Sequence, residues 1–237
     1  MMLKAMMEEK AMKLEGIQAC VFDAYGTLFD VAAVARGADE ALGEHARAIV
    51  ELWRAKQLQY TWLRGLAGHH ADFWQVTEDA LGFALASHGL DDAALRERLM
   101  ACYLRIPTYP EVPDVLHRLR AAGVKLAILS NGTPAMLESA VAHAGLSDCF
   151  DAVLSVEAVG VFKPHPSVYR LGEQALGHPA QAMCFVSSNG WDACSARAYG
   201  YRVMWCNRFG QPAERIPAEP DGMLPDLNGL PAVLGVA

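Results

Sequence analysis

No stretch of this sequence approaches the roughly 20 consecutive apolar residues that a membrane-spanning helix needs. The first 16 residues, MMLKAMMEEKAMKLEG, also lack the pattern of a signal peptide, because Lys and Glu are spread through them and no cleavage site follows. We therefore expect these residues to form a helical extension. The absence of both features predicts a cytoplasmic protein that does not interact with a membrane.

The sequence has no excess of positive charge either, since its net charge is −7. Proteins that bind nucleic acid or an anionic membrane surface carry basic patches or an overall positive charge. The composition therefore argues against both kinds of partner. If the substrate is an anion, a local cluster of Arg and Lys must bind it against this negative background.

Metal-binding patterns are missing as well, because none of the six cysteines forms a CxxC motif. Three of them lie in apolar stretches, which favours small buried side chains in a reducing compartment, with a catalytic thiol as the alternative. His69 and His70 resemble a metal-binding pair, but no further ligand lies near them in the sequence. We therefore predict neither a metal nor another cofactor.

The sequence does contain the pattern of an α/β protein. Its 237 residues are 53% apolar and 20% charged, which is ordinary for a globular chain. Five short apolar runs are typical of buried strands, and they lie at 17–22, 124–129, 152–156, 182–186 and 202–206. Amphipathic segments that begin with Pro and end near Gly separate the later runs, at 113–123, 133–146 and 165–177. This alternation predicts a doubly wound, mainly parallel, Rossmann-like sheet.

One long segment departs from this alternation. Residues 31–110 contain no convincing strand and show helical periodicity, as in ARAIVELWRAKQLQYTWLRGL. We predict that they form a helical cap inserted after the first strand. The core domain then comprises residues 17–30 and 111–237, and residues 1–16 precede it. The tail from Gln211 is rich in Pro and Gly, and we expect a surface loop with one last short strand or helix.

Unusual polar residues follow four of the predicted strands. Ligands of open parallel sheets bind beyond the carboxyl ends of the strands, so these residues are expected to meet at one site. They are Asp23 after the first strand, Ser130 and Asn131 after the second, Lys163 after the third, and Ser187, Ser188, Asn189 and Asp192 after the fourth. Asp23 by itself could cap a helix, but a partly buried carboxylate can also act as a nucleophile.

Together these motifs resemble the haloacid dehalogenase superfamily, and more narrowly its type II (S)-2-haloacid dehalogenases. The motifs are DAYGT at 23–27, SNG at 130–132, KP at 163–164 and SSNxxD at 187–192, and the resemblance extends over about residues 17–210. Phosphatases of this superfamily have a second Asp where this chain has Tyr25, and an acid where it has Ser188. Magnesium prefers several hard oxygen ligands, usually with more than one carboxylate among them. A site with Asp23 and Asp192 but no third acid is therefore expected to hold it poorly.

The resemblance implies a role for each residue near the strand ends. Asp23 attacks C2 of the haloacid and forms an ester, while Thr27 fixes its rotamer. Lys163 neutralises Asp23 or the substrate carboxylate, Tyr169 bonds Lys163 or Asp23, and Ser130 binds the substrate carboxylate. The residue expected to activate or orient the hydrolytic water is Asp192, with Asn189 and Ser187.

Further roles fall on residues of the predicted cap and on the apolar wall. Arg54 receives the halide with help from Asn131, and the wall around the substrate consists of Tyr25, Leu58, Phe73 and Trp191. Several of these residues also fit ordinary structural roles. Arg54 could lie on a solvated helix face, Leu58 and Phe73 could only pack the cap, and Lys163 could lie at the surface. Ser130, Asn131 and Asp192 could simply cap helices.

Taken together, the resemblance implies a hydrolase that acts on carbon–halide bonds, with a small 2-haloacid and a halide ion as its ligands. Its product is an (R)-2-hydroxy acid, and family members commonly form homodimers. Two alternatives stay open from the residues alone. One is a phosphatase of the same superfamily, and the other is a non-catalytic anion-binding protein on the same fold.

Overall fold

The structure is a computed structural model that describes residues 13–33, 42–90 and 92–236. Most of the predicted extension at 1–16 and part of the predicted cap, residues 34–41, lie outside these ranges. Where the described chain begins, Leu14 is buried and its backbone N–H donates to Val233 O at 2.8 Å. None of the described helices has both the length and the apolar composition to cross a membrane.

The centre of the fold is a six-stranded sheet in which every neighbouring pair is parallel. The strand order is β3-β2-β1-β4-β5-β6, with bounds β1 Ala19–Phe22, β2 Lys125–Ser130, β3 Ala152–Ser155, β4 Met183–Ser187, β5 Arg202–Cys206 and β6 Gly222–Leu224. The predicted fold class is confirmed. All four residues of β1 are buried, because strands of a parallel sheet are covered on both faces.

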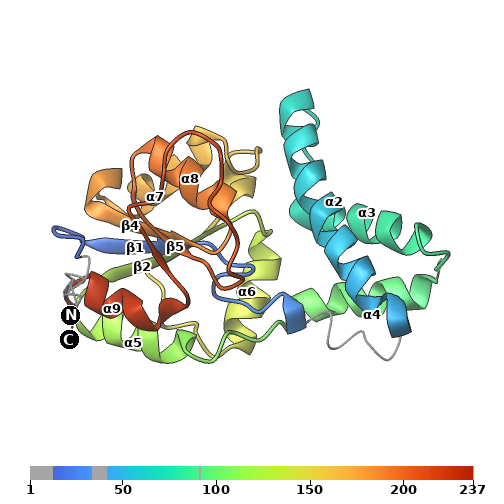
Figure 1. The fold of residues 1–237 in the computed structure, drawn as a ribbon, viewed down its shortest axis with the longest axis horizontal. Helices are drawn as coiled ribbons and strands as arrows, with labels where there is room; N and C mark the ends of the chain where they lie inside the picture. Colours follow the sequence, from blue (N-terminus) through green and yellow to red (C-terminus); the bar gives the residue numbers. More distant parts are fainter. Residues whose placement is uncertain (1–12, 34–41, 91, 237) are drawn as a thin grey trace, which may run out of the picture.

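Helices cover the two faces of this sheet. Figure 1 shows α7 and α8 on one face and α5 and α9 on the other. The helices of this part of the chain are α5 Val112–Ala121, α6 Pro134–His143, α7 Pro166–Leu176, α8 Gly190–Tyr199 and α9 Leu230–Val233, with short 3-10 helices η2 Val156–Ala158, η3 Ala180–Ala182 and η4 Leu227–Gly229. The tail from Gln211 therefore contains both a short strand, β6, and a short helix, α9.

The predicted starts and ends of these helices depend on capping residues. Thr133 accepts a hydrogen bond from Met136 N at the start of α6, where Pro134 is the first helical residue. The N-cap of α6 is therefore Thr133, and not Ser130 or Asn131, whose alternative role was to cap this helix. Gly177 ends α7 in the left-handed conformation. Asp192 lies inside α8, which excludes its alternative role as the cap of that helix.

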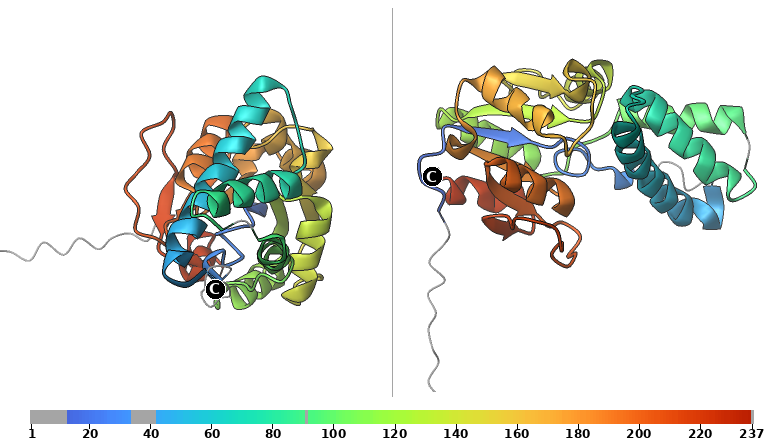
Figure 2. Two further views of the ribbon diagram at one scale, coloured as in Figure 1. Left: turned by 90° about the vertical axis from the view of Figure 1, so that its right-hand side faces the viewer. Right: turned by 90° about the horizontal axis from the view of Figure 1, so that it is seen from above.

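Helices α2, α3 and α4 form a separate group beyond the carboxyl ends of the strands, as Figure 1 and the right view of Figure 2 show. The described elements there are η1 Gly43–His45, α2 Ala46–Ala67, α3 Phe73–Ala86 and α4 Ala93–Leu104. No strand occurs among the described residues between β1 and α5, apart from isolated bridges of Phe29 with Tyr25 and with Thr108. The two connections to the sheet run side by side, because Asp30 N donates to Pro107 O at 2.8 Å.

Candidate active site

A small cavity of about 20 Å³ lies between the carboxyl ends of the strands and helices α2 and α3. It brings together residues that are far apart in the sequence. Its lining residues are Asp23, Tyr25, Arg54, Leu58, Phe73, Ser130, Asn131, Lys163, Asn189 and Trp191. All of them were predicted as site residues, and their individual roles stay predictions. Thr27, Tyr169, Ser187 and Asp192 lie behind this lining.

Asp23 follows the last residue of β1 at the base of the cavity and is 7% exposed. Three side chains donate to its carboxylate. Thr27 Oγ1 lies 3.0 Å and Asn189 Nδ2 2.9 Å from Oδ2, while Lys163 Nζ lies 3.1 Å from Oδ1. Hydrogen bonds from three directions fix the rotamer of a buried carboxylate. The alternative of a simple helix cap does not account for these three side-chain donors.

Lys163 lies between two carboxylates and is 1% exposed. Its Nζ atom is 2.8 Å from Asp192 Oδ2 and 3.1 Å from Asp23 Oδ1. Burial lowers the pKa of this lysine, but the charges of Asp192 and Asp23 and their hydrogen bonds outweigh that effect and raise the pKa above its ordinary value. Lys163 is therefore a fixed positive charge in the site, which excludes the surface lysine considered as its alternative.

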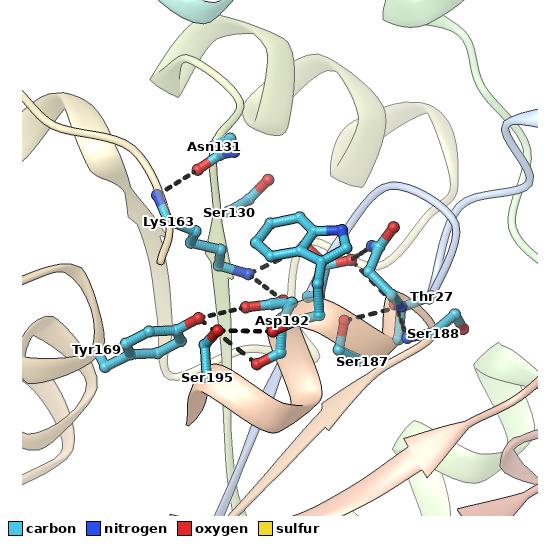
Figure 3. Close-up of polar contacts among 12 residues, drawn as sticks. Thr27, Ser130, Asn131, Lys163, Tyr169, Ser187, Ser188, Asp192 and Ser195 are labelled. Carbon is cyan, nitrogen blue, oxygen red and sulfur yellow. Dashed lines mark hydrogen bonds and ion pairs between the residues drawn. The ribbon is translucent and has the colours of Figure 1, made fainter. Parts of the chain in front are cut away.

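Asp192 is completely buried. Figure 3 shows it next to the end of the Lys163 side chain. Tyr169 points at it from α7 and donates from its hydroxyl to Oδ1 at 2.7 Å. The partner of Tyr169 is thus Asp192 rather than Lys163 or Asp23. Burial raises the pKa of Asp192 above its ordinary value; Lys163 opposes this effect, and Asp23 adds to it. Asp192 is consequently a stronger base than an exposed carboxylate.

The turn after β4 is built from hydrogen bonds to two hydroxyl groups. Ser187 Oγ accepts from Asn189 N at 3.1 Å, and Thr27 Oγ1 accepts from Ser188 N at 2.8 Å. Thr27 thus joins the turn after β4 to Asp23, because its hydroxyl also donates to that carboxylate. Gly26, whose φ of 92° is strained for any other residue, lets the chain turn back to place Thr27 there. Ser187 shapes this turn and so positions Asn189.

Arg54 reaches into the site from α2. Its Nη2 atom lies 3.4 Å from Asn189 Oδ1, and its Nη1 atom lies 2.5 Å from Gln57 Oε1. Asn189 therefore bridges Arg54 and Asp23, with its oxygen towards the guanidinium and its nitrogen towards the carboxylate. These contacts exclude the alternative of a solvated arginine on an outer helix face. The guanidinium offers several donors to an anion that develops above Asp23.

Ser130 is the last residue of β2 and Asn131 follows it, and both line the cavity with Asp23, which follows the neighbouring strand β1. Asn131 Oδ1 accepts from the backbone N of Lys163 at 3.0 Å, and Ser130 Oγ accepts from Gly132 N at 3.1 Å. The hydroxyl proton of Ser130 and the amide group of Asn131 remain able to donate to a carboxylate in the cavity. Arg54 contacts Asn189 across the site, and the expected help from Asn131 stays a prediction.

Aromatic and aliphatic side chains form the rest of the cavity. Tyr25 and Phe73 are buried with ring centroids 6.3 Å apart, whereas Leu58 and Trp191 are partly buried. The Tyr25 ring packs so tightly on Gly132 that an added Cβ there would lie 2.9 Å from it. Burial raises the pKa of the Tyr25 phenol, which therefore stays neutral. This wall keeps water away from Asp23 and strengthens the electrostatic interactions within the cavity.

The whole arrangement is that of a known family, because the haloacid dehalogenase-like hydrolase model matches residues 17–200. The chain belongs to this family. It is 48% identical to the (S)-2-haloacid dehalogenase of Pseudomonas sp. (strain YL), over 92% of this chain and 94% of the relative. An L-2-haloacid dehalogenase structure, RSc1362, has a TM-score of 0.91 at 44% identity and covers 93% of this chain and 99% of its own.

A second solved structure shows a member of the same family with a ligand attached. It is the L-2-haloacid dehalogenase from Xanthobacter autotrophicus with chloropropionic acid covalently bound. Its TM-score is 0.86 at 41% identity, and the alignment covers 92% of this chain and 98% of that one. The resemblance predicted from the motifs is thereby confirmed.

The donor set of this hydrolase does not fit a divalent cation. Within the described ranges, no group of three or more His, Cys, Asp and Glu side chains lies close enough to hold a metal ion. Lys163 Nζ occupies the space between Asp23 and Asp192, where a cation that these carboxylates share would lie. His70 contacts Glu157 at 2.9 Å and is not paired with His69. All six cysteines are free thiols, and none lines the cavity.

Sequence reasoning missed three residues that support the hydrolase site. Gln57 is buried and joins Arg54 to Thr77 on α3, although polar residues on a helix usually indicate its solvated face. Arg208 donates to Thr27 O at 2.9 Å and forms an ion pair with Glu111. Trp62 meets Trp191 edge to face, with centroids 5.4 Å apart. Only Gln57 carried a signal, because it follows Arg54 by one helical turn.

Proposed function

We propose that this protein is an (S)-2-haloacid dehalogenase, which hydrolyses short (S)-2-haloalkanoic acids to (R)-2-hydroxy acids and halide. The observation that carries this proposal is the Asp23 carboxylate, which three side-chain donors fix in a small cavity that Arg54 also lines. Tyr25 stands where a phosphatase of the superfamily has its second acid. The relatives named above are haloacid dehalogenases, and one of them carries chloropropionic acid as a covalent adduct.

In the first step, a carboxylate oxygen of Asp23 attacks C2 of the substrate in line with the carbon–halogen bond. The new C–O bond forms as the halide leaves with the bonding electrons, which inverts C2 and leaves an ester on Asp23. Ser130 and Asn131 bind the substrate carboxylate, while Arg54 and Asn189 face the departing halide. Fixing Asp23 with Thr27, Asn189 and Lys163 holds the nucleophile in one orientation, which an in-line displacement requires.

In the second step, water attacks the carbonyl carbon of the Asp23 ester. Asp192 activates or orients this water, because its raised pKa makes it a suitable proton acceptor. Lys163 remains protonated and stabilises the oxyanion that forms at the ester. The bond between the Asp23 carbonyl carbon and the substrate oxygen then breaks, and that oxygen takes the proton held by Asp192, which releases the hydroxy acid. The second proton of the water leaves to solvent as the Asp23 carboxylate is restored.

We further propose that residues 31–110 act as a cap over a core formed by residues 17–30 and 111–237. In support, α2 and α3 supply Arg54, Leu58 and Phe73 to the cavity, and the chain leaves and re-enters the core at adjacent points. A cavity of about 20 Å³ accommodates little more than one water molecule, so a substrate requires α2 and α3 to move away from the strand ends.

Two further proposals concern the cellular location and the oligomeric state of the enzyme. Free thiols at all six cysteines fit a reducing compartment, and we assign the protein to the cytoplasm. We also propose a homodimer, because apolar side chains such as Leu63 and Phe83 are exposed on α2 and α3. Size-exclusion chromatography with light scattering at micromolar concentration tests the dimer, and a single monomer peak contradicts it.

The mechanism is tested by a single turnover of (S)-2-chloropropionate in water labelled with oxygen-18, with enzyme in excess. The label is expected in the Asp23 carboxyl group, which mass spectrometry of the peptide detects, and not in the product lactate. Label in the product of this first turnover would contradict the ester. Chiral chromatography is expected to show (R)-lactate, and a phosphatase or a non-catalytic protein would release no halide at all.

A further inference from the structure

The cavity around Asp23 leaves no room for a large third substituent on C2. Asp23 approaches C2 from one side, the substrate carboxylate faces Ser130 and the halide faces Arg54, so the alkyl substituent of C2 is expected to face the wall that contains Leu58 and Trp191. The cavity of about 20 Å³ already requires α2 and α3 to move away before 2-halopropionate can bind, so a chain longer than its methyl group needs further space next to the cavity. The position and size of such space determine the chain length of the acids that the enzyme accepts.

Additional space lies directly beyond this wall. A pocket of about 420 Å³ adjoins the catalytic cavity, and both are bordered by Lys163 and Trp191. Its volume falls in the usual range for small-molecule pockets, roughly 300–1,000 Å³. Its other walls are the loop around Val161 and Phe162, one face of α2, and Ile216. Among the described residues, Lys163 is the only Lys, Arg, Asp or Glu that borders it, and His165 is its only histidine, so the pocket suits an apolar group.

One face of α2 runs continuously from the catalytic cavity into this pocket. Arg54 and Leu58 border the cavity, and Thr61, Trp62 and Gly65 border the pocket. Arg54, Leu58, Thr61 and Gly65 follow one another at intervals of four, three and four residues, which places them along one stripe of the helix, and Trp62 lies beside Thr61 at its edge. The pocket therefore extends the same interface between α2 and the strand ends, and is not a separate surface feature.

Two tryptophans and one glycine are among the residues that line this pocket. Trp62 and Trp191 meet edge to face at a centroid distance of 5.4 Å and an interplanar angle of 84°. Gly65 leaves part of the pocket unfilled, because it has no side chain. A Cβ added to it would lie 3.9 Å from its nearest neighbour, Val161 Cγ2. A helix interior normally disfavours glycine, by about 1 kcal/mol relative to alanine, so room in the pocket is a reason for it here.

We propose that this pocket binds the alkyl chain of 2-haloalkanoic acids longer than 2-halopropionate, with Trp62 and Trp191 lining the passage from C2. This assignment rests on the proposed dehalogenase function and specifies the substrates of that same site. The carboxylate and halide remain at Ser130 and Arg54, and only the chain enters the pocket. Each methylene group buried there is expected to improve kcat/KM about fourfold.

The experiment compares (S)-2-bromopropionate with (S)-2-bromohexanoate, whose chain has three more methylene groups. Gly65→Leu fills the pocket from α2, and Ile216→Trp fills it independently from a loop of the core, should the first variant fail to fold. Leu63→Trp is the matched control, because Leu63 lies on the same helix beside a different depression. Initial rates of bromide release give kcat/KM, and light scattering gives the mass of each variant.

We expect Gly65→Leu and Ile216→Trp to lower kcat/KM for bromohexanoate by about 10- to 60-fold. For bromopropionate the change stays within about twofold, and Leu63→Trp behaves like the wild type. An equal loss for both acids, no loss for either, or no turnover of bromohexanoate by the wild type overturns the assignment. A changed mass in both filled variants also overturns it, because the pocket then belongs to an interface between copies. Release of bromide from neither acid by the wild type rejects the dehalogenase function itself.

Discussion

The Nζ atom of Lys163 lies 2.8 Å from Oδ2 of Asp192, and both side chains are buried. The same ammonium group contacts Asp23 at 3.1 Å. Two carboxylates that share so small a volume repel each other, and the ammonium group between them offsets this repulsion. Lys163 thus holds the proposed nucleophile and the proposed base together in one site.

Replacing Lys163 with Met is therefore expected to impair both activity and stability. We expect kcat to fall about 100- to 1,000-fold, because the ester oxyanion loses its charged donor. The free energy of unfolding at pH 7 is expected to drop by about 3–5 kcal/mol, since two buried carboxylates lose their counterion. Halide release and urea unfolding measure the two effects. Lys125→Met is the control, because Lys125 contacts only a carbonyl oxygen, that of Leu176.

The difference in the free energy of unfolding between the wild type and Lys163→Met also has a predicted pH dependence. The pKa of Lys163 is raised in the folded protein above its unfolded value of about 10.4. Its contribution to stability is therefore complete below that pH and is lost as the pH rises through the folded pKa. The deficit of Lys163→Met should be constant from pH 7 to 10 and shrink at higher pH. A deficit that shrinks already between pH 7 and 9 would contradict the assigned protonation state.

Protonation of Asp192 is expected to set the acid limb of kcat. Burial raises its pKa, so the carboxylate begins to take up a proton at a pH above the ordinary value of about 3.9. By the same linkage, Asp192 alone lowers the stability of the folded state as the pH rises from about 3.9 through the folded pKa, because the folded state binds this proton more tightly. The limb, measured from single-turnover ester hydrolysis, should lie above pH 4.

The control for this assignment is a pair of variants. Asp192→Asn should remove the acid limb along with most of the hydrolysis, and a labelled ester should then accumulate on Asp23. Asp79→Asn, which removes a partly exposed ion pair with Arg64 and changes an exposed hydrogen bond from Gln75, should leave the profile of the wild type, because both contacts lie outside the cavity. An unshifted limb that persists in Asp192→Asn would assign the base to another residue.

Removal of divalent cations is expected to have no effect on turnover. The reason is the position of Lys163 Nζ between the two acidic side chains of the site, together with Tyr25 in place of a further carboxylate. Dialysis against EDTA, followed by rate measurements with and without millimolar MgCl₂, checks this expectation. A rate that falls in EDTA and recovers with magnesium would show that a cation takes part.

The location of the site could be predicted from the sequence because the sheet is parallel. Apolar runs that are followed by polar residues must place those residues at one edge, so Asp23, Ser130, Lys163 and Asp192 were expected to meet. Close pairs along the chain, such as Asp23 and Thr27, follow from the turn itself. The family motifs then indicated which of these residues are functional.

Contacts between distant segments could not be predicted in the same way. Arg54 and Asn189 are 135 residues apart, and Arg208 and Thr27 are 181 apart. These pairs depend on how α2 packs against the strand ends and how the loop after β5 folds back, which no local pattern specifies. The three-residue strand β6 has no fully buried residue, so it carries no apolar run that would indicate a strand.

Gln57 provides the last prediction, because it fixes Arg54 in position. Its Oε1 accepts from Arg54 Nη1 at 2.5 Å, and its Nε2 donates to Thr77 Oγ1 at 2.7 Å. Gln57→Met keeps the volume but removes both hydrogen bonds. A hydrogen bond to a charged group contributes about 1.5–3 kcal/mol, so kcat/KM is expected to fall roughly 10- to 100-fold as the guanidinium loses its orientation towards the halide.

The matched control is Gln59→Met, because Gln59 lies on the same helix and bonds only the exposed Lys56. This variant should keep the wild-type kcat/KM. Urea unfolding separates the loss of the Thr77 contact, expected at about 1 kcal/mol, from the loss of catalysis. If Gln57→Met lost stability but kept both kcat and KM, Arg54 would be orientated by Asn189 alone, and the buried amide would serve only to join α2 to α3.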